Sequence, residues 1–233
     1  MARSRYTRLR VTRPDAVLFD ALDTLVVRRP SLEEAIAKHG DRDALERAWT
    51  QAVASVPWPQ AWDDARRVAR FWERFYGALA AGLVDEPEAR EAVAAELIRT
   101  QTGPDGLKPA PEAASTLEAL RRDGYRLGVV ANAEPWLRDV LAASGLASLL
   151  DAIVISADVG VAKPEPAIFA LALEALGTEA ERAVFVGDQP RVDGEGAAAA
   201  AIPFVLFDPD GFEPAWPGRR IERLSELPRL LAT

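Results

Sequence analysis

Residues 16–25 read AVLFDALDTL. The first four are apolar, which predicts a buried strand. The run ends in Asp20, followed closely by Asp23 and Thr24. Because open α/β sheets build their active sites at the carboxyl ends of parallel strands, Asp20 is the first candidate for chemistry. Leu22 stands between the two acids and brings only a hydrocarbon side chain to this edge.

Beyond this strand, two different patterns divide the chain. After a connector at 28–30 (RRP), the helix patterns follow one another without a strand, at about 31–39, 41–55, 60–82 and 86–101. After a hinge-like turn at 102–106 (TGPDG), helices and strands alternate. The predicted strands lie at 125–131, 152–155, 183–186 and 204–207, and the predicted helices at 111–123, 134–144, 164–176, around 197–201 and at 221–230.

Such alternation predicts an α/β fold, a parallel sheet flanked by helices. We therefore expect a core made of residues 1–27 and 106–233 and an inserted all-helical domain at 28–105. An insertion after the first strand belongs to the active-site edge, where it can act as a lid.

Composition and charge exclude several functions. The chain has 233 residues and no run that approaches the roughly 20 apolar residues of a membrane span. It has no cysteine and one histidine, His39, which excludes thiolate catalysis and multi-histidine metal sites. The net charge is −8, and because the first thirteen residues carry five arginines and no acid, the remainder carries −13. We expect a cytoplasmic protein that binds neither nucleic acid nor membrane.

Polar residues follow four predicted strands. They are Asp20, Asn132, Lys163 and the pair Asp188 and Asp193. Three carboxylates at neighbouring strand ends repel one another unless a cation binds them, and oxygen ligands suit Mg²⁺. Lys163 adds a fixed positive charge, so the edge suits a small anionic substrate, above all a phosphate.

Four segments in register resemble the motifs of the haloacid dehalogenase superfamily of hydrolases, of the type with a helical (C1-type) cap. They are DALDTL at 20–25, AN at 131–132, KPEP at 163–166 and GDQPRVD at 187–193. The resemblance runs from about residue 16 to 207 and implies a Rossmann-like core.

The resemblance also implies roles for individual residues. Asp20 is the nucleophile that forms an aspartyl-phosphate, and Lys163 orients nucleophile and phosphate. Mg²⁺ is held by Asp20, the main-chain carbonyl of Leu22 and Asp188, with Asp193 in support.

Three further residues are candidates for binding the substrate beside Lys163. They are Thr24, Asn132 and Arg191, the last because it lies within the fourth motif.

Two positions depart from the motifs. The family's phosphatases carry a general acid two residues after the nucleophile, and here that position is Leu22. Ala131 lacks the hydroxyl that would contact the phosphate. Asp23 replaces the usual glycine of the turn, and since Asp tolerates a left-handed backbone we interpret it as structural.

Four functions stay open. The first is a Mg²⁺-dependent phosphatase of a small phosphorylated metabolite, slow or with its acid supplied by Asp23, Glu134 or a cap residue. The second is a dehalogenase-like hydrolase, disfavoured by the Gly187-Asp188 pair. The third is a carbon–phosphorus hydrolase that uses Lys38, and the fourth is a non-catalytic binding protein. A monomer and a homodimer are equally compatible with the sequence.

Overall fold

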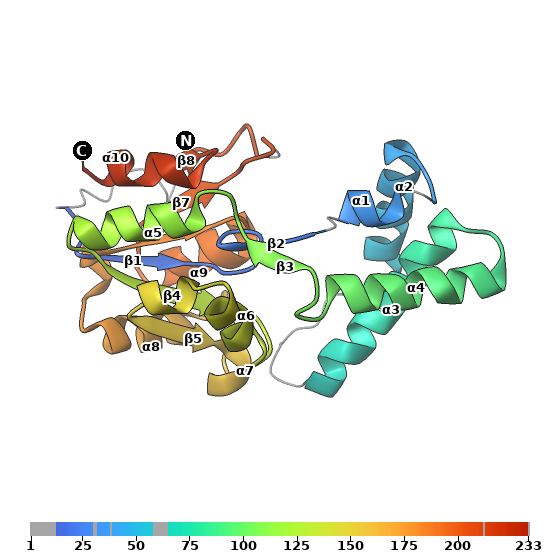
Figure 1. Ribbon diagram of the computed structural model, residues 1–233, viewed down its shortest axis with the longest axis horizontal. Helices are drawn as coiled ribbons and strands as arrows, with labels where there is room; N and C mark the ends of the chain where they lie inside the picture. The colour runs from blue at the N-terminus through green and yellow to red at the C-terminus, as the bar shows by residue number, and fades with distance from the viewer. Residues whose placement is uncertain (1–12, 30–31, 38, 58–64, 212, 233) are drawn as a thin grey trace. The chain divides into compact units, whose positions relative to one another are not determined.

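The computed structural model describes residues 13–29, 32–37, 39–57, 65–211 and 213–232. One sheet has six strands, in the order β5-β4-β1-β6-β7-β8 (Figure 1). All its strand pairs are parallel. The strands are β1 (Ala16–Phe19), β4 (Arg126–Ala131), β5 (Ala152–Ile155), β6 (Ala183–Gly187), β7 (Phe204–Phe207) and β8 (Arg219–Ile221). The predicted parallel, Rossmann-like sheet flanked by helices is confirmed.

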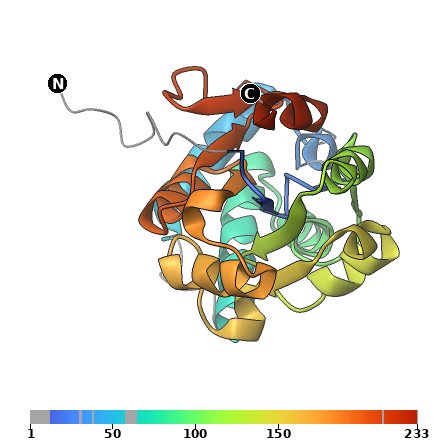
Figure 2. The ribbon, with the colours of Figure 1, turned by 90° about the vertical axis from the view of Figure 1, so that its left-hand side faces the viewer.

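Strand β1 lies in the middle of this sheet because its residues are apolar on both faces. All four are fully buried, between β4 on one side and β6 on the other. Leu18 packs into a cluster with α8 (Pro166–Leu176) and α9 (Glu195–Ala199). Helices α5 (Ala113–Arg122) and α10 (Leu227–Leu231) lie on the other side of β1, next to each other in both views (Figures 1 and 2).

Shorter elements complete this part of the chain. They are α6 (Leu137–Ala143), α7 (Ser156–Val159), the 3₁₀ turns η1 (Leu146–Leu149), η2 (Ala180–Arg182) and η4 (Leu224–Glu226), and the π-turn η3 (Pro190–Gly194). The π-turn directly precedes α9, so the predicted helix around 197–201 begins earlier and in a different geometry.

The inserted segment is helical, as predicted. Its helices are α1 (Leu32–Ile36), α2 (Arg42–Ser55), α3 (Ala65–Leu83) and α4 (Pro87–Gln101). Asp41 caps α2 by accepting the Ala44 N–H at 2.8 Å, and Glu86 caps α4 in the same way. The aromatic residues of α3 form part of a buried cluster with α2 and α4, among them Phe71 and Phe75.

By its internal contacts the chain divides into two compact units. The core unit comprises Met1–Val27 and Pro109–Thr233, and the helical unit comprises Arg28–Lys108. This division by contacts falls after 108, and the predicted domain bounds of 28 and 105 stay a prediction. Among the described residues, no helix is long and apolar enough to cross a membrane.

Three short strands were not expected. The connector predicted from Arg28 onward is the end of β2 (Val26–Arg28), which pairs with β3 (Leu107–Pro109). The helix predicted from Ile221 is preceded by β8, and only η4 and α10 are helical there. Strands of three residues are too short to show an alternating pattern, so only their pairing partners reveal them.

Candidate active site

The predicted site residues come from the carboxyl ends of neighbouring strands. Asp20 follows β1, Asn132 follows β4 and Asp188 follows β6. The Asp20 N–H donates to the Val186 carbonyl at 2.8 Å, so the ladder between β1 and β6 continues to the residue that bears the carboxylate. Because the sheet is parallel throughout, all three side chains start from the same edge.

Lys163 lies between two carboxylates at this edge. Its Nζ donates to Oδ1 of Asp20 and, at 2.8 Å, to Oδ1 of Asp193. The three side chains are only 2%, 8% and 1% exposed, respectively. Buried charges are stable only when paired and hydrogen-bonded, so both carboxylates depend on Lys163, and the lysine depends on them.

Hydrogen bonds from the main chain hold both ends of this triad. The Asn132 side-chain amide donates to the Lys163 carbonyl and accepts from the Lys163 N–H, both at 2.8 Å. Oδ2 of Asp193 accepts the Gln189 N–H at 3.0 Å, and the Asp193 N–H donates to the Gln189 carbonyl at 2.7 Å. Lys163 therefore reaches Asp20, and Asp193 reaches Lys163, from backbones that hydrogen bonds hold in place.

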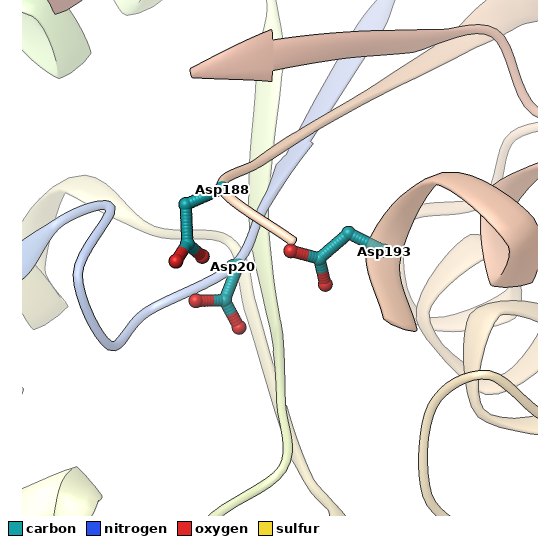
Figure 3. A group of neighbouring side chains, drawn as sticks. All are labelled: Asp20, Asp188 and Asp193. Atoms are coloured by element: carbon teal, nitrogen blue, oxygen red, sulfur yellow. The ribbon is translucent and has the colours of Figure 1, made fainter. Parts of the chain in front are cut away.

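Asp188 completes a cluster that has the donor set of a hard cation. One carboxylate oxygen from each of Asp20, Asp188 and Asp193 lies within 4.8 Å of the others. Figure 3 shows the Asp188 carboxylate directed at Asp20, with Asp193 approaching from the next turn. Oδ1 of Asp188 is buried and has no hydrogen-bond partner among the described residues. These residues fit Mg²⁺, which prefers carboxylate oxygens and would satisfy that oxygen.

Burial and mutual repulsion shift the protonation of the cluster. Burial raises the pKa of Asp20 to about 7. The positive charge of Lys163 lowers this pKa, and the negative charge of Asp193 raises it. Burial also raises the pKa of Asp188 well above its usual value, and the charges of Asp20 and Asp193 add to that rise. For Lys163, burial acts to lower the pKa, but Asp193 and Asp20 outweigh it and raise the pKa. Without a cation, the cluster therefore holds protons near neutral pH that a bound cation would displace.

The turn after Asp20 is tight. Asp23 has the left-handed backbone (φ 63°) that its place in the turn predicted, and its N–H donates to the Val26 carbonyl at 2.8 Å; its purely structural role stays a prediction. Leu22 is half-buried and forms an isolated β-bridge with Val26. In this bridge the Val26 N–H donates to the Ala21 carbonyl, and the Val26 carbonyl accepts the Asp23 N–H. The Leu22 carbonyl takes no part in those bonds. Thr24 is fully buried, and its hydroxyl has no partner in the described part of the chain.

The remaining candidates lie around this centre. Arg191 is exposed on the π-turn that carries Asp193. Ala131 is buried at the end of β4. The Glu134 carboxylate accepts the Trp136 Nε1–H at 3.1 Å. Lys38 and the arginine-rich segment up to residue 12 lie outside the described residues. Substrate binding by Thr24, Asn132 and Arg191 stays a prediction.

Two supporting residues were missed at the sequence level. Ser156 is 1% exposed directly after β5, and its hydroxyl contacts both the N–H (3.2 Å) and the carbonyl (3.3 Å) of Ala133. A polar residue at a strand end was a signal that could have identified it. Phe185, inside β6, lies with its ring centroid 5.4 Å from Lys163 Nζ. An apolar residue in a buried strand gives no such signal.

Comparisons with known proteins agree on one family. The family model described as haloacid dehalogenase-like hydrolase matches residues 14–201. Glyceraldehyde 3-phosphate phosphatase of Methanopyrus kandleri is 31% identical over 191 residues, 80% of this chain and 81% of that protein. Phosphoserine phosphatase of Thermus thermophilus is 38% identical over 122 residues, about half of each chain (50% and 49%). A crystal structure of a dehalogenase has a TM-score of 0.67 and 26% identity, over 96% of this chain and 99% of that one.

Proposed function

Because the chain belongs to the haloacid dehalogenase-like hydrolases, we propose that it is a Mg²⁺-dependent phosphatase of a small phosphorylated metabolite that reacts through an aspartyl-phosphate on Asp20. The observation that carries the proposal is the buried triad of Asp20, Lys163 and Asp193, with Asp188 beside it. The similarity to two named phosphatases supports the same reaction class.

In the proposed reaction Asp20 and Lys163 have different roles. A carboxylate oxygen of Asp20 attacks phosphorus, the bond from phosphorus to the leaving oxygen breaks, and that oxygen departs with the electron pair. The Lys163 ammonium, held by Asn132 and Asp193, keeps Asp20 oriented and balances negative charge. Water then attacks phosphorus and releases Asp20 as a carboxylate. Mg²⁺, held by Asp20, Asp188 and the Leu22 carbonyl with Asp193 in support, would supply positive charge that offsets the carboxylates and polarises the phosphoryl group.

Leu22 limits this chemistry. A hydrocarbon side chain neither protonates the leaving group nor activates the water, and loss of such a group costs about 10²–10⁴-fold in rate. We therefore expect slow hydrolysis of ordinary phosphate monoesters by the native protein, unless Asp23, Glu134 or a residue of the helical unit supplies the proton.

A screen of small phosphate compounds with Mg²⁺ tests the proposal. Phosphate release is expected from the wild type and not from Asp20→Asn, and the wild type alone should carry a phosphoryl group that hydroxylamine removes. Turnover that survives Asp20→Asn would contradict the assignment of the nucleophile. If the wild type folds and binds Mg²⁺ but releases no phosphate from any compound, the non-catalytic alternative replaces the phosphatase.

A dehalogenase-like hydrolase is the second candidate. It is favoured by Leu22, because a halide leaves without a proton, and by the similarity to the solved dehalogenase. It predicts chloride release from 2-chloro acids in the presence of a chelator, whereas the phosphatase requires added Mg²⁺. A cytoplasmic location, the role of the helical unit as a cap, and a monomer or homodimer stay predictions.

A further inference from the structure

A second buried carboxylate organises the segment between β7 and β8. Asp208 is 5% exposed, and its N–H donates to the Ile221 carbonyl at 2.9 Å. Its Oδ2 accepts the Glu213 N–H and Arg220 Nη1, both at 3.1 Å. The Trp216 N–H in turn donates to the Glu213 carbonyl at 3.0 Å. These bonds tie the segment to the strand that follows it and set the position from which the Trp216 ring projects.

A series of contacts between aromatic rings connects Trp216 to Lys163. Trp216 meets Phe204 edge to face, with ring centroids 5.6 Å apart and planes at 85°. Phe204 stacks on Phe185 at 6.3 Å and 21°. The Phe185 centroid lies 5.4 Å from Lys163 Nζ. We name these three rings the aromatic stack.

The stack also contacts the backbone beside Asp193. Gly194 is the last residue of the π-turn. A Cβ atom at Gly194 would lie 3.2 Å from Cε1 of Phe204 and 3.3 Å from Cη2 of Trp216. Such a distance is tighter than ordinary packing, so the two rings lie directly against this backbone. The stack therefore supports both partners of one hydrogen bond, that of Lys163 Nζ to Asp193 at 2.8 Å.

We propose that Trp216 is a positioning residue for Asp193, and through Asp193 for the cation-binding cluster. The inference rests on the proposed function, since it assigns Mg²⁺ to that cluster. In this proposal Trp216 acts by holding the π-turn at the distance that Asp193 needs. Loss of a group that orients metal ligands typically costs 10–100-fold in metal affinity, and about that effect is expected here.

Calorimetric titration of the full chain with Mg²⁺ tests the proposal. Trp216→Ala should weaken Mg²⁺ binding by about 10-fold or more. Trp216→Phe, which retains a ring against Phe204, should lose much less. Leu171→Ala is the matched control, because Leu171 is an exposed apolar residue on α8, and it should bind Mg²⁺ like the wild type. Melting temperatures of all variants without the metal separate lost affinity from lost stability.

Gly194→Ala perturbs the same contact from the opposite side. It should also weaken Mg²⁺ binding, and it provides the test if Trp216→Ala does not fold. A lower melting temperature with unchanged Mg²⁺ affinity in these variants would overturn the inference while leaving the proposed function intact. No Mg²⁺ binding by the wild type would overturn both.

Discussion

The Asn132 side chain holds Lys163 through the main chain of the lysine rather than through its ammonium charge. The side-chain amide donates to the Lys163 carbonyl and accepts from the Lys163 N–H, each at 2.8 Å. The donor and the acceptor of the amide are thus both bonded to one residue, which lies 31 positions further along the chain. The Lys163 ammonium therefore starts from a backbone that the end of β4 keeps in place.

Replacement of Asn132 should lower turnover without abolishing it. Asn132→Ala removes both bonds, and because small displacements of catalytic groups cost up to about 10²-fold, kcat should fall by about that factor. Asn132→Asp keeps the acceptor and loses the donor, so its effect should be intermediate. Steady-state kinetics measures both. If only KM changes, Asn132 binds the substrate instead of positioning Lys163.

Leu22→Asp should create a proton donor. Hydrolysis of an alkyl phosphate such as glycerol phosphate should rise by about 10²–10⁴-fold. Formation of the aspartyl-phosphate from p-nitrophenyl phosphate or acetyl phosphate, measured as the initial burst of leaving group, should change little, because these leaving groups depart without protonation.

The matched control is Leu22→Asn, which has a similar shape to Leu22→Asp and no acidic proton. Equal gains in the two variants would show that side-chain size at this position, and not acidity, limits the native rate. An unchanged rate in Leu22→Asp would indicate that another group already supplies the proton.

Removal of Lys163 should destabilise the fold as well as the reaction. Lys163→Met leaves Asp20 and Asp193 buried without their cation, and breaking a buried ion pair costs about 3–5 kcal/mol. Urea denaturation in a chelating buffer measures that loss at pH 7.5. At pH 5 the loss should shrink, because burial raises the pKa of Asp20 to about 7 in the wild type and loss of Lys163 removes a group that lowers that pKa, so the carboxyl is neutral in both proteins. A loss that does not depend on pH would argue for packing instead.

Stabilisation by Mg²⁺ should depend on pH. The pKa of Asp20 in the folded, metal-free protein is raised by burial to about 7, against about 3.9 in an unfolded chain. Between these values the folded state binds more protons, so the contribution of Asp20 to stability declines as pH rises from about 4 to 7. Mg²⁺ needs the ionised form. It should therefore raise the melting temperature more at pH 8 than at pH 5.5.

Scanning calorimetry with MgCl₂, against NaCl at equal ionic strength, measures this difference. Asp20→Asn should show a smaller dependence of the Mg²⁺ effect on pH. Equal stabilisation of the wild type at both pH values would contradict the predicted competition between protons and the metal.

Close packing of the helical unit gives a prediction about stability alone. A Cβ at Gly82 on α3 would lie 2.7 Å from the Ala48 Cβ on α2, so Gly82→Ala should destabilise the protein by about 1–3 kcal/mol. Gly77→Ala on the same helix is the control, since nothing lies within 4 Å of its Cβ. It should stabilise the helix by up to about 1 kcal/mol. Thermal melts compare the two variants.

The sequence by itself determined the α/β core, the helical insertion and the edge at which the chemistry would lie. Apolar runs such as 16–19 and 183–186 are long enough to identify buried strands. The charged residues that follow these runs in the sequence mark the edge of the sheet at which the site is expected. Residues 26–28, 107–109 and 219–221 were missed as strands, because three residues carry no periodic signal.

Only the tertiary structure decided how the site residues support one another. Three contacts in the site join distant parts of the chain. Lys163 donates to both Asp20 and Asp193. Asn132 binds the Lys163 backbone, and Trp216 lies against Gly194. Local pattern carries no information about such pairs, since each depends on how strands and turns pack. The same packing buries Asp20 and so sets its pKa, which the identity of the residue alone does not give.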